Sequence, residues 1–127
     1  MIIVDDPLVA IVARDHPWAS RKLVQPAELA RAKLIALAPG TGARLALDRM
    51  LARADAVSRP RWEVATPAFL KLLAAQGLGV GVMSEPAVED PALVVLRIAD
   101  PKARSQLGVV WRPGPRPATR ALLERLV

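Results

Sequence analysis

Residues 66–84 constrain the fold more than any other segment, because a capped helix there runs directly into an apolar strand. Thr66 can accept a hydrogen bond from the first free amides, and Pro67 suits the first helical position, which needs no N–H. Gly77 permits the left-handed turn that ends the helix. The broad apolar face predicted for this helix consists of Phe69, Leu70, Leu72, Leu73 and Ala74.

The strand that follows, 79–83, is short and apolar and shows no polar alternation. This pattern is typical of a strand covered on both faces. Ser84 then opens another helical turn. A helix followed by such a strand predicts an open α/β sheet, in which ligands bind where strands end and helices begin.

Length and composition exclude several classes of protein. The 127 residues suit one domain with a core of its own, and no apolar run reaches the 18 or more residues of a membrane span. No signal-peptide pattern opens the chain. The absence of cysteine excludes disulfides, thiolate chemistry and cysteine-ligated metals. We therefore expect a cytoplasmic protein that does not enter a membrane.

The net charge of +6 raises the question of nucleic-acid binding. The arginines are scattered along the whole chain, however, and aromatic residues make up only 3%, too few for base-stacking platforms. A solvated basic surface is favoured over a dedicated polyanion site.

Further strands are predicted from short apolar runs, and further helices from periodic ones. In the helix predicted over 43–54, Arg44 and Asp48 lie one turn apart and can pair. The Pro-Gly-Pro sequence at 113–115 is the strongest internal boundary. The other predicted strands are 8–13, 34–37, 62–65, 93–98 and 107–111, and the other predicted helices are 26–30, 85–88 and 117–127.

Two of the predicted helices start directly after a strand, at Thr41/Gly42 and at Thr66/Pro67. In a parallel-type sheet these starts share one edge, where unpaired N–H groups and the positive helix end suit a carboxylate or phosphate. Gly40 and Gly42 would let a ligand approach the backbone, and Thr41 offers a hydroxyl. The alternative is that these residues only cap helices.

The sequence gives only weak signals for a set of catalytic residues. His16 is the only histidine and lies in a turn beside Pro17, and no serine has the context of a nucleophile elbow. Nothing in the spacing of the glutamates brings two of them to a common site, and PGTG at 39–42 lacks the Lys-Ser/Thr of a phosphate-binding P-loop. The sequence favours binding over reaction, with no metal and no cofactor.

The order of motifs resembles the effector-binding domain of LysR-type transcriptional regulators. No single motif is specific, but their order and spacing extend over nearly the whole chain. The most specific is the Gly-Leu-Gly sequence at 77–79 before an apolar strand. The matching segments are PLVAIV at 7–12, DHPWA at 15–19, LIAL at 34–37, PGTG at 39–42, EVAT at 63–66, LAAQGLGV at 73–80, VMS at 82–84 and LGVVWR at 107–112.

The resemblance implies an α/β fold of the type 2 periplasmic-binding-protein kind, with about five strands in a mixed sheet flanked by helices. It implies that 6–112 form the second of two effector-binding subdomains and that 113–127 form a C-terminal helix returning to the first. The family's helix-turn-helix and most of its first subdomain have no counterpart in these residues. We therefore expect DNA binding only through that missing domain. We also expect self-association through 117–127, because the leucines of this helix would be exposed without the first subdomain.

Carried over by position, the family's cleft contacts fall on the two helix starts named above. They are Pro39, Gly40, Thr41, Gly42, Thr66, Pro67 and Ala68. The resemblance implies a small, carboxylate-like effector held in an interdomain cleft, and only weak affinity for it in this chain alone. The alternatives are a solute-binding module or half of an enzyme with the same architecture.

Overall fold

The computed structural model describes residues 2–85 and 90–109. Its helices are α1 (Pro26–Arg31), α2 (Gly42–Arg53) and α3 (Pro67–Ala75). Its strands are β1 (Ile2–Ala13), β2 (Leu23–Val24), β3 (Leu34–Leu37), β4 (Trp62–Val64), β5 (Val80–Ser84), β6 (Leu93–Ile98) and β7 (Arg104–Val109). No helix in this part of the chain is long and apolar enough to cross a membrane.

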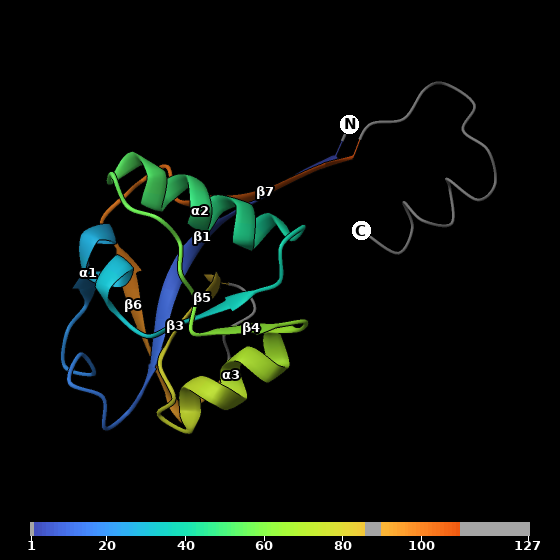
Figure 1. The fold of residues 1–127 in the computed structure, drawn as a ribbon. Coiled ribbons are helices and arrows are strands. Elements are labelled where there is room, and N and C mark those ends of the chain that lie inside the picture. Colours follow the sequence, from blue (N-terminus) through green and yellow to red (C-terminus); the bar gives the residue numbers. More distant parts are fainter. Residues whose placement is uncertain (1, 86–89, 110–127) are drawn as a thin grey trace.

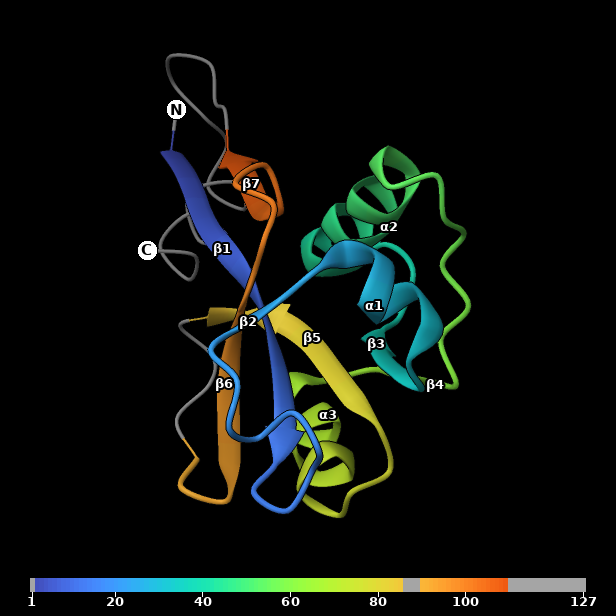
Figure 2. The ribbon, with the colours of Figure 1, turned by 90° about the vertical axis from the view of Figure 1, so that its left-hand side faces the viewer.

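The strands form one mixed sheet in the order β2-β6-β1-β5-β3-β4. β3 pairs in parallel with both β4 and β5, whereas β1 is antiparallel to β5 and β6. The first half of β1 leaves this sheet and pairs instead with β7, so that Ile2–Pro7 and Arg104–Val109 form a two-stranded ribbon (Figure 2).

Together with β7, which among the described strands pairs only with β1, the six strands of this order make a sheet of seven strands, where about five were expected. β2 was not predicted, because two residues are too few to show a periodicity. The strand predicted over 8–13 begins earlier, at Ile2, and its added part includes the polar residues Asp5 and Asp6. In the structure these residues pair with β7 in a narrow ribbon, where charged side chains remain in water.

The helices cover both faces of the sheet, with α1 and α2 on one side and α3 on the other (Figure 1). This division follows from topology. α2 connects β3 to its neighbour β4, and α3 leads back across β3 to β5. Because crossovers between parallel strands are right-handed, two crossovers that run in opposite directions place their helices on opposite faces.

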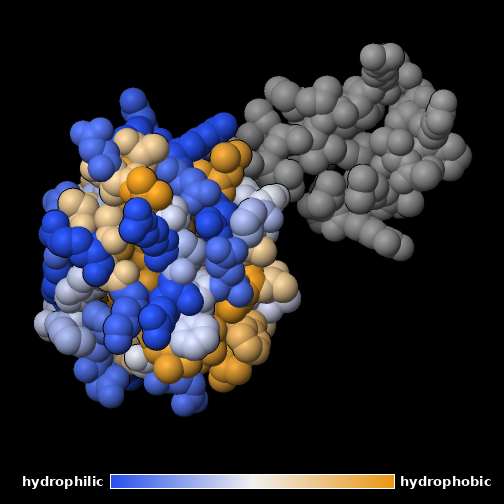
Figure 3. All heavy atoms as spheres, in the orientation of Figure 1, coloured by the Kyte–Doolittle hydropathy of each residue, from blue (hydrophilic) through white to orange (hydrophobic). Residues whose placement is uncertain are grey.

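α3 starts and ends as predicted but buries a narrower face than expected. Leu70 and Ala74, four residues apart, are fully buried against the sheet, whereas Phe69 and Leu72 are about half exposed. A helix that packs on a sheet with one side only can bury a single stripe of its residues. Leu73 is partly buried against the core, whereas Phe69 and Leu72 lie on the surface, and Figure 3 shows hydrophobic residues gathered in this region.

β5 is covered on both faces, as expected, and Val80–Met83 are all buried. Two glycines allow this close packing. A Cβ on Gly81 would lie 2.5 Å from Leu70 Cδ2 and 2.8 Å from Ile11 Cγ1, and a Cβ on Gly79 would collide with the backbone carbonyl of Lys33. α3 and β3 therefore approach β5 more closely than a side chain at either position would permit.

The remaining predicted elements agree with the structure to within a few residues. The helix over 43–54 appears as α2 with its Arg44–Asp48 pair at 3.0 Å, and 34–37 appears as β3. The strand over 107–111 begins earlier, at Arg104. The helix at 117–127 and, apart from Glu85, the helix at 85–88 lie outside the described residues, as does the segment 113–127.

The short α1 is held by a charged cap. Glu28 accepts hydrogen bonds from Arg21 at 2.6 and 2.7 Å and from the Gln25 backbone amide at 3.0 Å. These bonds, that from Arg21 foremost, lower the pKa of Glu28 from 4.5 to about 2. Since the pKa is lower in the folded state, the pair's stabilisation is complete above about pH 5 and disappears as the pH falls towards 2.

Glu28→Gln is therefore expected to lower the unfolding temperature near neutral pH and to make little difference at pH 2. Thermal melts of both proteins between pH 2 and 7 measure this. An offset between the two proteins that did not change with pH would contradict the assignment.

Candidate functional site

The two helix starts predicted as a site lie side by side. Strands β3 and β4 are parallel neighbours with Leu37 opposite Val64, and the Ala38 amide donates to the Val64 carbonyl at 2.9 Å. The turns that follow these strands, 38–42 and 65–68, therefore leave the same edge of the sheet. We call these two turns the rim. That an effector binds to the rim stays a prediction.

The rim is divided between the two faces of the sheet. α2 begins at one turn and α3 at the other, and the two helices lie on opposite sides (Figure 1). In open α/β sheets a crevice forms at the carboxyl ends of neighbouring strands whose connections diverge in this way, and ligands bind there. Every predicted site residue is exposed except Thr41, which is half-buried.

Thr41 and Thr66 both cap helices, which was the alternative to a role in ligand binding. Thr41 Oγ1 accepts from the Arg44 amide at 3.1 Å and donates to the Ala38 carbonyl at 3.1 Å. Thr66 Oγ1 accepts from the Phe69 amide at 3.2 Å. The hydroxyl of Thr41 is thus occupied by the backbone, and we expect the rim to bind through amides rather than through this hydroxyl.

Backbone amides remain free beside these caps. Among the described residues, Gly42, Ala43 and Ala68 have no recorded acceptor for their N–H groups. Pro67 has no N–H to offer, so α3 contributes only one of the three donors. Free N–H groups at two neighbouring helix starts favour a negatively charged ligand group.

Gly40 shapes the rim through its backbone. Its φ of +98° lies in the left-handed region, and a Cβ there would meet nothing within 4 Å. The position needs glycine for its conformation, and the close approach of a ligand to Gly40 stays a prediction.

Arg44 holds the rim together, a role that was not predicted from the sequence. Its side chain is only 10% exposed, and its guanidinium donates to Asp48 at 3.0 Å and to the Leu37 carbonyl at 3.2 Å. The same guanidinium lies 3.5 Å from Glu63 on β4. Arg44 therefore links α2 to the ends of both strands. The Arg44–Asp48 spacing was visible in the sequence, but the contacts across the sheet were not.

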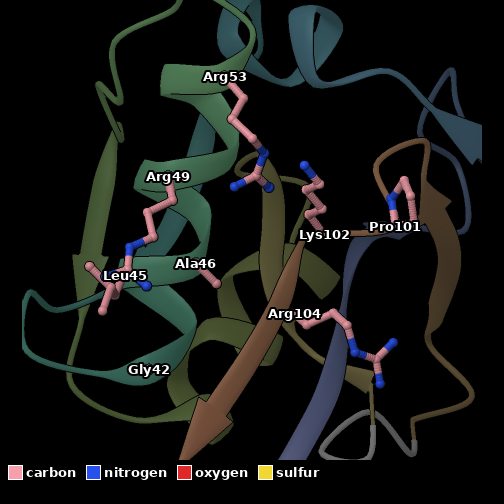
Figure 4. Close-up of a pocket in the computed structure, with 8 residues that line it drawn as sticks. All are labelled: Gly42, Leu45, Ala46, Arg49, Arg53, Pro101, Lys102 and Arg104. Carbon is pink, nitrogen blue, oxygen red and sulfur yellow. The ribbon is translucent and has the colours of Figure 1, made fainter.

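A basic groove borders the rim, with a volume of about 370 Å³ (Figure 4). It starts at Gly42 and follows one face of α2 towards Arg53, opposite the connection from β6 to β7. Residues spaced three or four apart along a helix share a face, which brings Leu45, Arg49 and Arg53 into one row. The lining residues are Gly42, Leu45, Ala46, Arg49, Arg53, Pro101, Lys102 and Arg104.

The catalytic candidates do not meet at the rim. His16 follows β1, which runs antiparallel to β5, and therefore lies at the opposite edge of the sheet. Its Nδ1 accepts from the Trp18 amide at 2.9 Å, and partial burial lowers its pKa. Within the described ranges, no three His, Asp or Glu side chains are placed to hold a metal ion.

These features define the class of fold. A mixed sheet flanked by helices, with two helices that start at one edge of the sheet and a central strand that continues into a ribbon, is a type 2 periplasmic-binding-protein-like subdomain. The fold class expected from the sequence is confirmed by solved structures of the same kind. The regulatory domain of CcmR from Synechocystis PCC6803, in complex with 2-PG, superposes with a TM-score of 0.74. It is 26% identical in sequence, and the match covers 97% of this chain and 62% of that one.

The chain belongs to the LysR substrate binding domain family, whose family model matches residues 2–127. A RuBisCO operon transcriptional regulator of Acidithiobacillus ferrooxidans is 28% identical over 128 residues, 96% of this chain and 41% of the regulator. The dual regulator OxyR of Escherichia coli K12 is 30% identical over 114 residues, 87% of this chain and 37% of OxyR. The chain thus spans about two fifths of these relatives. They are transcriptional regulators and not enzymes, in agreement with the sequence analysis.

Proposed function

We propose that this chain is the effector-sensing part of a LysR-type transcriptional regulator. A small anionic metabolite would bind at the rim, inside a cleft whose other wall is a second subdomain. In this proposal 6–112 form one subdomain, 113–127 return to the other, and DNA is bound by a helix-turn-helix outside these residues.

The observation that carries the proposal is the pair of adjacent helix starts with free amides. The N–H groups of Gly42, Ala43 and Ala68 suit one carboxylate or phosphate group, and the two helix dipoles add to the attraction. The CcmR regulatory domain, a relative with the same fold, was solved with 2-PG bound. This supports a small ligand for the family member described here.

Such a ligand would act by differential binding. An effector that contacts both walls of a cleft favours the closed arrangement over the open one by the difference in its two affinities. We infer that closure changes how the subunits of an oligomeric regulator are arranged, and with it the spacing of the DNA-binding heads. Self-association through 117–127 remains part of this proposal.

Gly42→Pro tests the rim amides. Proline suits this first helical position, and Thr41 before it is already extended with ψ of 151°, the conformation that a residue before proline prefers. The substitution therefore removes one N–H while keeping the helix start. In an NMR titration of the 127-residue chain with acetate, we expect weak binding that shifts the amides of Ala43 and Ala68, and an affinity at least about threefold lower in Gly42→Pro.

Gly42→Ala is the matched control, because it adds a Cβ at the same place and keeps the N–H. It should bind acetate at least about threefold more tightly than Gly42→Pro does, and acetamide, which has the same shape without the charge, should not bind. Equal acetate affinity in Gly42→Pro and Gly42→Ala, or shifts confined to other residues, would overturn the proposed site. A titration with 2-PG extends the same comparison.

A further inference from the structure

The basic groove carries a second inference, separate from the rim. The two features share only Gly42, because the groove runs away from the rim along α2 (Figure 4). Its cationic side chains come from two segments far apart in the sequence: Arg49 and Arg53 from α2, and Lys102 and Arg104 from the start of β7 and the loop before it.

The positive charge of the groove is only partly neutralised. Arg53 pairs with Asp100 at 2.9 Å, and Arg104 pairs with Asp5 at 2.6 Å. Arg49 and Lys102 have no recorded ion pair with any residue in 2–85 or 90–109. Counting Asp100 against Arg49, Arg53 and Lys102 leaves two positive charges in the groove.

Two of the cationic side chains face each other across the groove. In Figure 4 the end groups of Arg53 and Lys102 point towards each other across the gap, whereas the guanidinium of Arg49 extends away from them, towards Leu45. Arg104 turns away from α2, as its pair with Asp5 requires. Like charges that face each other across a concave surface repel one another, and an anion between them removes that repulsion.

We propose that this groove binds a small phosphate monoester, with its dianionic phosphate between Arg53 and Lys102 and with Arg49 adding positive charge further along the same groove. The charge of such a group matches the two uncompensated cations, and arginine's forked donors fit phosphate oxygens. Leu45, half exposed, and Pro101 lie beside the cations and offer an apolar surface for the carbon part of the ligand.

The shape of the site favours a small molecule over a nucleic-acid backbone. A concave volume of about 370 Å³ lies within the range of small-molecule pockets. Backbone binding instead relies on an extended stripe of cations, and the arginines of this chain are spread over the whole sequence.

The test is an NMR titration of the 127-residue chain with inorganic phosphate, against sodium chloride at equal ionic strength. We expect saturable shifts of the amides in 45–53 and 101–104 with a Kd of about 1–10 mM, since exposed charges bind weakly. The double variant Arg49→Gln/Lys102→Gln is expected to raise this Kd at least about tenfold. All of these side chains are exposed, so the variant should melt within a few degrees of the unmodified chain.

Arg59→Gln removes the same kind of charge from an exposed loop outside the groove and should leave the Kd unchanged within about twofold. If the control variant bound phosphate equally weakly, the effect would come from net charge alone and the proposed site would be wrong. The same conclusion would follow if sodium chloride produced the same shifts.

Phosphate shifts confined to 39–43 and 66–69 would assign binding to the rim alone and would contradict the groove. The double variant Arg49→Gln/Lys102→Gln separates the two sites, because it should weaken phosphate in the groove and leave the acetate-induced shifts of Ala43 and Ala68 at the rim unchanged. A duplex oligonucleotide that shifted the groove amides more strongly than phosphate would also contradict the proposal.

Discussion

Leu70→Ala is expected to lower the free energy of unfolding by about 2–5 kcal/mol, a large part of the stability of a domain this size. Leu70 is fully buried between α3 and the sheet, and its Cδ2 lies over the bare backbone of Gly81. Truncation leaves a cavity at that point. The surrounding strands cannot fill it, because β1, β5 and β3 are held together by their hydrogen-bonded registers.

Leu72→Ala is the matched control, since it removes the same atoms two residues further along α3 from a side chain that is 52% exposed. It should change stability by no more than about 0.5 kcal/mol. Urea unfolding followed by circular dichroism measures both variants. If the two lost equal stability, the packing of α3 described above would be wrong.

Gly79→Ala is expected to destabilise the fold by about 1–3 kcal/mol or more, although it adds a single methyl group. The new Cβ would collide with the Lys33 carbonyl, which also accepts the Val80 amide at 2.8 Å. A backbone group cannot rotate away as a side chain can. The methyl group therefore has to push β5 away from β3, which stretches the hydrogen bonds between them.

Gly81→Ala is the informative comparison for Gly79→Ala. Its nearest neighbours are side-chain atoms, Leu70 Cδ2 and Ile11 Cγ1, which can shift more than a backbone carbonyl can, so we expect a smaller loss than at Gly79. Since Leu70→Ala removes the nearest of these atoms, Gly81→Ala should be less harmful in that background than alone. A double-mutant cycle with strictly additive energies would contradict the described contact.

The sequence predicted the regular elements best where each carries its own start and stop signals. α3 has Thr66 and Pro67 at its start and Gly77 after its end, and the structure places it within a few residues of the prediction. The strand over 34–37 was predicted equally well, because a short unbroken apolar run is typical of a buried strand. The ribbon half of β1 could not be predicted, because its pairing with β7 joins residues about a hundred positions apart.

The candidate site was predictable in its backbone and less so in its side chains. Strands followed by capped helices place 39–42 and 66–68 at one edge whenever β3 and β4 are parallel neighbours, and they are. The contacts of Arg44 with Leu37 and Glu63 depend on the register between strands, which no local pattern reveals. The same holds for the basic groove, whose two sides are about fifty residues apart in the sequence.

The continuity of β1 has a mechanical consequence. A single strand of 12 residues pairs with β7 over its first half and then becomes an inner strand of the main sheet, with Leu8 anchored by its amide to the Ala103 carbonyl at 2.9 Å. We therefore expect a twist of the β1–β7 pair about its long axis to reach the buried residues Ala10 and Ile11 directly, because no loop lies between them to absorb it.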